Sequence, residues 1–160
     1  MHTIRIPLAA ILSVILSLGL VASCDDSAEQ PMAIASCDQE TRAEAYVAGM
    51  SKTGANGLEV ILVESTPTPP RKGNNDWRVR ILDASGSPLS GLTLDVVPEM
   101  PDHGHDSIIY PTATEVEGQA GEYLLVPVRL WMPGYWEVNV AIDDGAGLTD
   151  SAQFKLCIEG

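Results

Sequence analysis

Two histidines and a methionine lie close together in the stretch "EMPDHGHDS", Glu99–Ser107. His103 and His105 are the only histidines of the chain apart from His2 near its start. Neutral imidazole is a common metal ligand, and a thioether such as that of Met100 suits soft ions such as Cu(I). These residue types raise the question of a metal site, and the elements around them must show whether the side chains can converge.

The N-terminal segment has the features of a signal peptide. Arg5 precedes an apolar stretch, Leu8–Ala22, which is shorter than the roughly 20 residues of a membrane-spanning helix. The last residues of this segment, "VASC", resemble a bacterial lipobox, in which the cysteine is lipidated and becomes the new N-terminus. We therefore expect residues 1–23 to be removed and Cys24 to carry a lipid that anchors the protein in the cell membrane, on its periplasmic or extracytoplasmic face. The alternative is an ordinary signal peptide with an incidental cysteine.

The two remaining cysteines, Cys37 and Cys157, lie near the two ends of the mature chain. An even number of cysteines in an exported protein predicts a disulfide bond, with two buried free thiols as the alternative. Residues 24–36 are small and polar and predict a flexible tether, which leaves residues 37–160 as one domain.

The domain sequence alternates between short strand-like segments and turns rich in Gly, Pro, Asp and Ser. One such segment alternates apolar Trp77, Val79 and Ile81 with charged Arg78 and Arg80, as expected for a half-buried strand. This pattern predicts an all-β fold, an immunoglobulin-like antiparallel β-sandwich of about seven strands. The predicted strands are residues 58–65, 77–83, 92–100, 111–117, 122–130, 136–142 and 152–158. Residues 39–50 are compatible with either a short helix or an extended segment.

The order of the predicted strands suggests where the histidines lie. If successive strands are antiparallel, the segment after Met100 and the turn "WMPGY" lie at the same end of the sandwich. Met132 then joins Met100, His103 and His105, and this set of two imidazoles and two thioethers suits copper. The same reasoning places Cys157 and the loop "TPTPPRKGNND" at that end.

Two alternatives to a copper site stay open from the residues alone. Zinc would bind His103, His105 and a carboxylate, either Asp102 or Asp106, and would leave the methionines unused. Otherwise the stretch is an exposed polar loop without a metal, in which Met100 closes the core.

The chain resembles a known family over Trp77–Ile142. The shared motifs are the turn "DASGSPLSG", a Met-Pro pair followed by histidines, and the closing "MPGYWEV", which are similar to those of YtkA-like domains, related to FixH-like proteins. The resemblance implies a small immunoglobulin-like sandwich outside the cytoplasm, in settings of metal handling or respiratory oxidase assembly. The family's methionine and histidine positions fall on Met100, His103 and His105. Family members commonly have a second methionine close to the first, whereas this chain does not, so Met132 must supply the second sulfur.

The sequence argues against two classes of function. The net charge of −13 disfavours nucleic acid as a partner, because phosphate recognition relies on clustered Lys and Arg. We find no nucleophile elbow, Walker loop, dinucleotide fingerprint or Cys-x-x-Cys, and Ser107, His105 and Asp106 are too close in sequence to form a triad readily. We therefore expect a non-enzymatic, lipid-anchored protein that binds metal, copper above all, for delivery or sequestration. The alternative is a non-catalytic interaction module that supports a respiratory or transport complex in the membrane and binds no metal; Arg71 and Lys72 are candidates for its contact surface.

Overall fold

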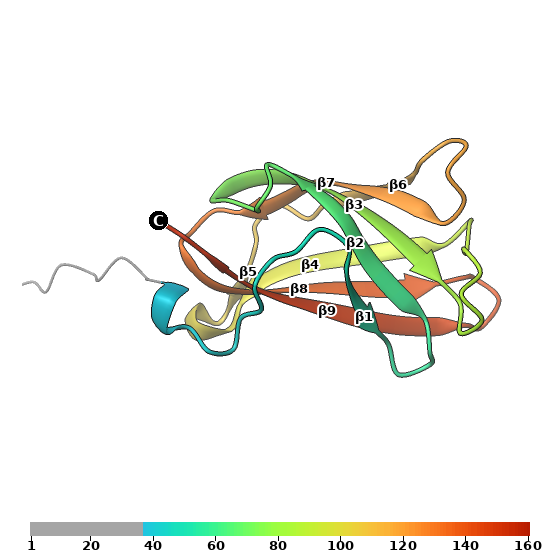
Figure 1. The fold of residues 1–160 in the computed structure, drawn as a ribbon, viewed down its shortest axis with the longest axis horizontal. Coiled ribbons are helices and arrows are strands. Elements are labelled where there is room, and N and C mark those ends of the chain that lie inside the picture. Colours follow the sequence, from blue (N-terminus) through green and yellow to red (C-terminus); the bar gives the residue numbers. More distant parts are fainter. Residues whose placement is uncertain (1–36) are drawn as a thin grey trace, which may run out of the picture. The chain divides into compact units, whose positions relative to one another are not determined.

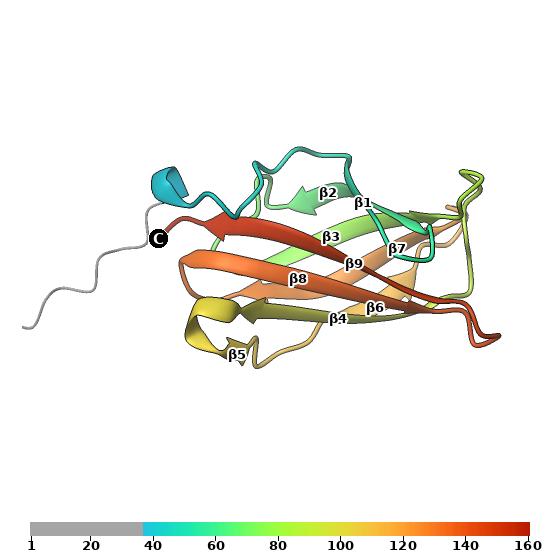
Figure 2. The same ribbon diagram turned by 90° about the horizontal axis from the view of Figure 1, so that it is seen from below.

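The computed structural model describes residues 37–160. The predicted signal peptide, the lipidation site Cys24 and the tether 24–36 therefore lie outside the described residues. The described chain forms nine β-strands in two antiparallel sheets that pack face to face (Figure 1, Figure 2). One sheet contains β1 (Met50–Thr53), β2 (Glu59–Thr66), β3 (Gly73–Leu82), β7 (Glu122–Leu130) and β6 (Thr112–Glu115), in this spatial order. The other contains β5 (His105–Asp106), β4 (Thr93–Met100), β8 (Gly134–Asp143) and β9 (Thr149–Ile158).

The predicted β-sandwich is confirmed, and each of the seven predicted segments corresponds to a strand. The two further strands, β1 and β5, have only four and two residues and pair along the edges of β2 and β4. Two short 3-10 helices also occur, η1 (Cys37–Gln39) and η2 (Pro101–His103). The rest of segment 39–50 is not helical, and its Glu44 N–H donates to the Lys155 carbonyl at 2.8 Å. No helix within residues 37–160 is long and apolar enough to cross a membrane.

The core lies between the two sheets and is built by the alternation seen in the sequence. Trp77, Val79 and Ile81 of β3 are fully buried, as is Trp136 of β8. Trp77 contacts Phe154 of β9 edge-on, with ring centroids 5.9 Å apart, so the aromatic rings join one sheet to the other. Trp77, which the sequence placed on the apolar face of a half-buried strand, is therefore a core residue, and so is Trp136.

The predicted disulfide joins Cys37 to Cys157, with their Cα atoms 5.6 Å apart. It fastens η1 to the end of β9 at one end of the sandwich, where the described chain also begins (Figure 1). Because the two cysteines are 120 residues apart in sequence, the bond closes nearly the whole domain into one loop.

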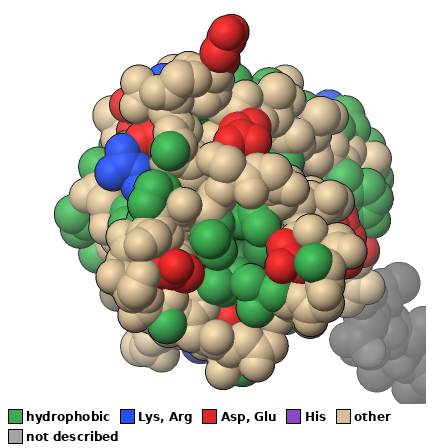
Figure 3. All heavy atoms as spheres, turned by 90° about the vertical axis from the view of Figure 1, so that its right-hand side faces the viewer, with side chains coloured by type: hydrophobic (Ala, Val, Ile, Leu, Met, Phe, Trp, Pro, Cys, Tyr) green, Lys and Arg blue, Asp and Glu red, His purple; other side chains and the backbone are tan. Residues whose placement is uncertain are grey.

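The strand register places the histidine segment, the turn before β8 and Cys157 at one end of the sandwich. β4 and β8 pair antiparallel with Glu99 opposite Glu137, so the end of β4 lies beside the start of β8. Tyr135 in turn lies opposite Cys157. The histidine segment, the turn before β8 and the disulfide therefore share one end of the sandwich, as predicted. Figure 3 shows the opposite end, where acidic side chains surround an apolar centre and no histidine of the described chain is visible.

Candidate metal centre

A tight reversal of the chain after β4 positions the two histidines. Pro101 opens η2, where its fixed φ suits the first helical position. Gly104 ends η2 in the left-handed conformation, at φ 64°, and its N–H donates to the carbonyls of Met100 and Pro101. The chain then returns along β4, with His105 opposite Met100. The reversal brings the imidazoles of His103 and His105 together, with ring centroids 5.6 Å apart and an interplanar angle of 38°.

This separation suits two ligands of one ion. Two imidazoles whose nitrogens lie about 2 Å from a shared ion have centroids roughly 5–6 Å apart. His103 is exposed and His105 is half-buried, so both rings are accessible from the end of the sandwich. The Nδ1 of His105 lies 3.2 Å from the Asp106 carbonyl oxygen. A proton on Nδ1 would be donated to that oxygen, which leaves Nε2 free for a metal, in the arrangement common to metal-binding histidines.

Trp131 forms one wall of the histidine pair. Its indole stacks on the His105 ring, with centroids 5.5 Å apart and an interplanar angle of 24°. Trp131 lies in the turn between β7 and β8, and it was not predicted as a site residue. Its place directly before Met132 in that turn is the sequence feature that could have identified it.

The two predicted methionine ligands lie at the same end of the sandwich. Met100 is buried, with 1% of its surface exposed, and packs in the core. Because it lies opposite His105 in register, the two side chains point to the same face of the sheet. Met132 is partly buried, packs against the core, and accepts a hydrogen bond on its carbonyl from the Trp136 indole at 2.9 Å. The structure thus places all four predicted residues at one end of the sandwich, and their role as metal ligands stays a prediction.

The two carboxylates beside the histidines have other partners. The Asp102 carboxylate accepts hydrogen bonds from both terminal nitrogens of Arg42, at 2.7 and 2.6 Å. These bonds hold the pKa of Asp102 below its ordinary value. Asp106 accepts a hydrogen bond from the Tyr110 hydroxyl at 3.1 Å. Within residues 37–160, no three side chains of His, Cys, Asp or Glu are grouped to hold a metal ion. The site with two histidines and a carboxylate, which zinc would need, is therefore not assembled.

Arg42 connects the histidine segment to the start of the domain. Besides Asp102, its guanidinium donates to the Glu40 carboxylate at 2.9 and 2.6 Å, which lowers the pKa of Glu40. The guanidinium carbon also lies 4.2 Å above the centre of the Tyr135 ring. Burial and a hydrogen bond to Glu137 raise the pKa of the Tyr135 hydroxyl. Arg42 was not predicted as a site residue, because 60 residues separate it from Asp102.

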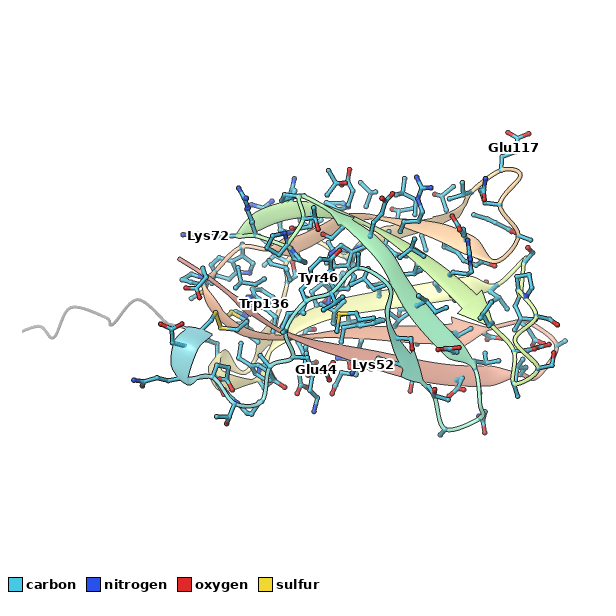
Figure 4. All side chains as sticks on the ribbon, in the orientation of Figure 1. Glu44, Tyr46, Lys52, Lys72, Glu117 and Trp136 are labelled. Carbon is cyan, nitrogen blue, oxygen red and sulfur yellow. A yellow bond between two sulfur atoms is a disulfide. The ribbon has the colours of Figure 1, made fainter. Side chains whose placement is uncertain are left out.

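A groove with a volume of about 850 Å³ lies at the same end of the sandwich as the histidines, which do not line it. It runs between the end of β9 and the loop before β3, and its apolar surface comes from Tyr46, Pro70 and Ile158 among others. Arg71 and Lys72 line it, and neither forms an ion pair within the described part of the chain. Figure 4 shows Lys72 at the same end as Trp136, and Glu117 at the opposite end.

Together, the fold and the site define a two-sheet β-sandwich with an imidazole pair at one end. The family model for YtkA-like proteins matches residues 52–141, more than half of the chain, and the chain belongs to this family. The family resemblance is thus confirmed, and the match begins in β1, upstream of the residues that first indicated it. No curated protein matches the sequence.

Two similar solved structures are both of FetP from uropathogenic Escherichia coli. A copper-bound variant of FetP is 16% identical to this chain, with a TM-score of 0.45, and the similarity covers 69% of this chain and 96% of FetP. FetP as isolated after expression in the periplasm has the same identity and TM-score, over 70% of this chain and 95% of FetP.

Proposed function

We propose that this protein is an extracytoplasmic lipoprotein that binds copper, for delivery or sequestration. The observation that carries the proposal is the pair of accessible imidazoles, His103 and His105, with centroids 5.6 Å apart. The thioethers of Met100 and Met132 at the same end add soft ligands for Cu(I), whereas imidazole accepts both oxidation states. Zinc is disfavoured because Asp102 and Asp106 are engaged with Arg42 and Tyr110.

The location outside the cytoplasm is supported by the disulfide. Disulfides persist in oxidising compartments and are rare where thiol reductants maintain free cysteines. The Cys37–Cys157 bond therefore agrees with the signal peptide and lipobox expected from residues 1–24.

Titration of purified residues 25–160 with Cu(I), against a competing chelator, tests copper binding. We expect one equivalent to bind at neutral pH. Binding of Cu(II), which quenches nearby indoles, should also lower the fluorescence of Trp131, because its ring stacks on His105. A Trp131→Phe variant, which keeps an aromatic ring there, is the control for this signal. If the domain retains no copper against the chelator, the proposed function is wrong.

Copper affinity should fall on acidification. Protons compete with the metal for the imidazole nitrogens, so two histidine ligands release copper as they become protonated. Repeating the chelator titration at pH 7 and pH 5 measures the loss. An affinity that stays constant over this range would exclude the histidines as ligands.

A Cys24→Ser variant of the full chain should leave the membrane. With Cys24 lipidated, the wild-type protein partitions into the detergent phase, because several acyl chains on one cysteine give stable anchoring. We expect the variant to appear in the soluble fraction or in the detergent-poor phase. A variant that fractionates with membranes as the wild type does would contradict lipid anchoring at this residue.

The second candidate function is a non-catalytic interaction module that supports a membrane complex. The groove favours it, because it combines apolar walls with two cations, Arg71 and Lys72, that have no acidic partner within residues 37–160. Glu40, Glu44 and Glu159 also line the groove, so the surface fits a partly apolar segment of another protein whose acidic group pairs with Lys72 or Arg71.

Charge reversal in the groove tests this second function. If the groove binds an acidic partner, Lys72→Glu should reduce crosslinking of the protein to its membrane partners. Glu117→Lys, a charge change of equal size at the opposite end (Figure 4), is the control and should leave crosslinking intact. Equal crosslinking by the wild type and the Lys72→Glu variant would exclude the groove as the contact surface.

A further inference from the structure

We propose that Arg42 determines the metal specificity of the histidine site by holding the Asp102 carboxylate away from the metal. This inference rests on the proposed metal site at His103 and His105. It explains how a segment that carries both imidazoles and carboxylates favours copper over zinc.

Asp102 is one of the two carboxylates next to the histidines in the sequence, and it could complete a zinc site. It lies within η2, directly before His103 in the sequence. Two imidazoles and one carboxylate are a common protein ligand set for zinc, whereas copper is satisfied by imidazole and thioether ligands. Without a partner, the exposed Asp102 side chain is free to rotate toward a metal bound by the neighbouring histidines. The composition of this segment alone would therefore permit zinc.

The contact with Arg42 prevents this rotation. Both oxygens of Asp102 accept hydrogen bonds from the guanidinium, at 2.7 and 2.6 Å. This paired geometry is the strong form of an arginine–carboxylate contact, and each oxygen that a metal would take must first be released by Arg42. The ion pair thus lowers the affinity for any metal that needs the carboxylate.

Arg42 is itself held in place, so the contact is more than an isolated surface ion pair. Glu40 accepts hydrogen bonds from the Arg42 backbone N–H at 2.7 Å and from its guanidinium. The Tyr135 ring, which is almost fully buried in β8, supports the guanidinium from one side at 4.2 Å. Isolated surface ion pairs contribute little, but a network with paired geometry on a fixed aromatic ring keeps its arrangement.

Zinc titration of an Arg42→Leu variant tests the proposal. We expect the variant to bind zinc roughly tenfold more tightly than the wild type, because Asp102 becomes available as a third ligand. Its affinity for Cu(I), which does not use the carboxylate, should change by less than about threefold. The double variant Arg42→Leu/Asp102→Asn is the matched control and should lose the gain in zinc affinity, because an amide oxygen is a weaker ligand. No gain in Arg42→Leu, or a gain that survives in the double variant, would overturn the proposal.

A second variant keeps the proposal testable if Arg42→Leu fails to fold. In the wild-type background, Asp102→Asn should leave the zinc and copper affinities unchanged, because Asp102 is not a ligand while Arg42 holds it. A tenfold loss of either affinity would show that Asp102 already binds the metal and that Arg42 does not exclude it. The wild-type copper titration tests the proposed function separately, so failure of that function and failure of this inference are distinguishable.

Discussion

Replacing both His103 and His105 with alanine should abolish specific copper binding, with a loss of affinity of at least about a hundredfold for Cu(I) and for Cu(II). Imidazole is the one ligand type of the proposed site that serves both oxidation states, so its removal leaves neither ion with its main donors. Chelator competition at neutral pH measures the change. Both side chains lie on the reversal at the end of the sandwich, outside the core cluster, so the variant should keep its fold, which a thermal melt verifies.

The matched comparison is with the two methionines. Met100→Leu and Met132→Leu should weaken chiefly Cu(I), because a thioether suits the softer ion. Leucine has nearly the volume of methionine, so even at buried Met100 the loss of stability should stay below about 1.5 kcal/mol. If the double histidine variant binds copper as tightly as the wild type, no site exists at this end, and the interaction module becomes the better explanation of the protein.

Much of the sandwich could be predicted because its strands alternate strongly between buried and exposed side chains. β3 is the clearest case, with Trp77, Val79 and Ile81 in the core and Arg80 on the surface. Two strands escaped prediction for a physical reason. β1 and β5 are stabilised by pairing with a neighbouring strand, and four or two residues are too few to show a periodic pattern.

The candidate site was predictable only in part, for a similar reason. The order of antiparallel strands was enough to place Met132 at the same end of the sandwich as the histidines, because this placement depends only on how many strands separate them. The position of the Trp131 ring on His105, and the contact between Arg42 and Asp102, depend on loop conformations and side-chain rotamers. Arg42 and Asp102 are 60 positions apart, and no local sequence pattern predicts a contact over such a separation. The contact on which the proposed metal specificity rests is therefore one that only the structure reveals.

Removal of the disulfide should produce the largest loss of stability. We expect the double variant Cys37→Ser/Cys157→Ser to lower the free energy of unfolding by about 2–5 kcal/mol, because the bond closes a loop of 120 residues and restricts the unfolded chain. Urea denaturation of the wild type, the double variant and the wild type treated with a thiol reductant measures the effect. The reduced wild type should match the double variant, which separates loss of the bond from loss of the sulfur atoms.

The same comparison tests how the disulfide supports the candidate site. The bond fixes η1 to β9. Arg42 follows Gln39, the last residue of η1, by only three positions. Below its unfolding transition, the double variant should therefore show a less restrained Arg42 and, if Arg42 keeps Asp102 from the metal, a higher zinc affinity than the wild type.

Mass spectrometry of a digest prepared without reduction should find the peptides of Cys37 and Cys157 crosslinked. Two alkylatable thiols in freshly isolated protein would contradict the bond, and the stability of the domain would then rest on the contacts between its two sheets.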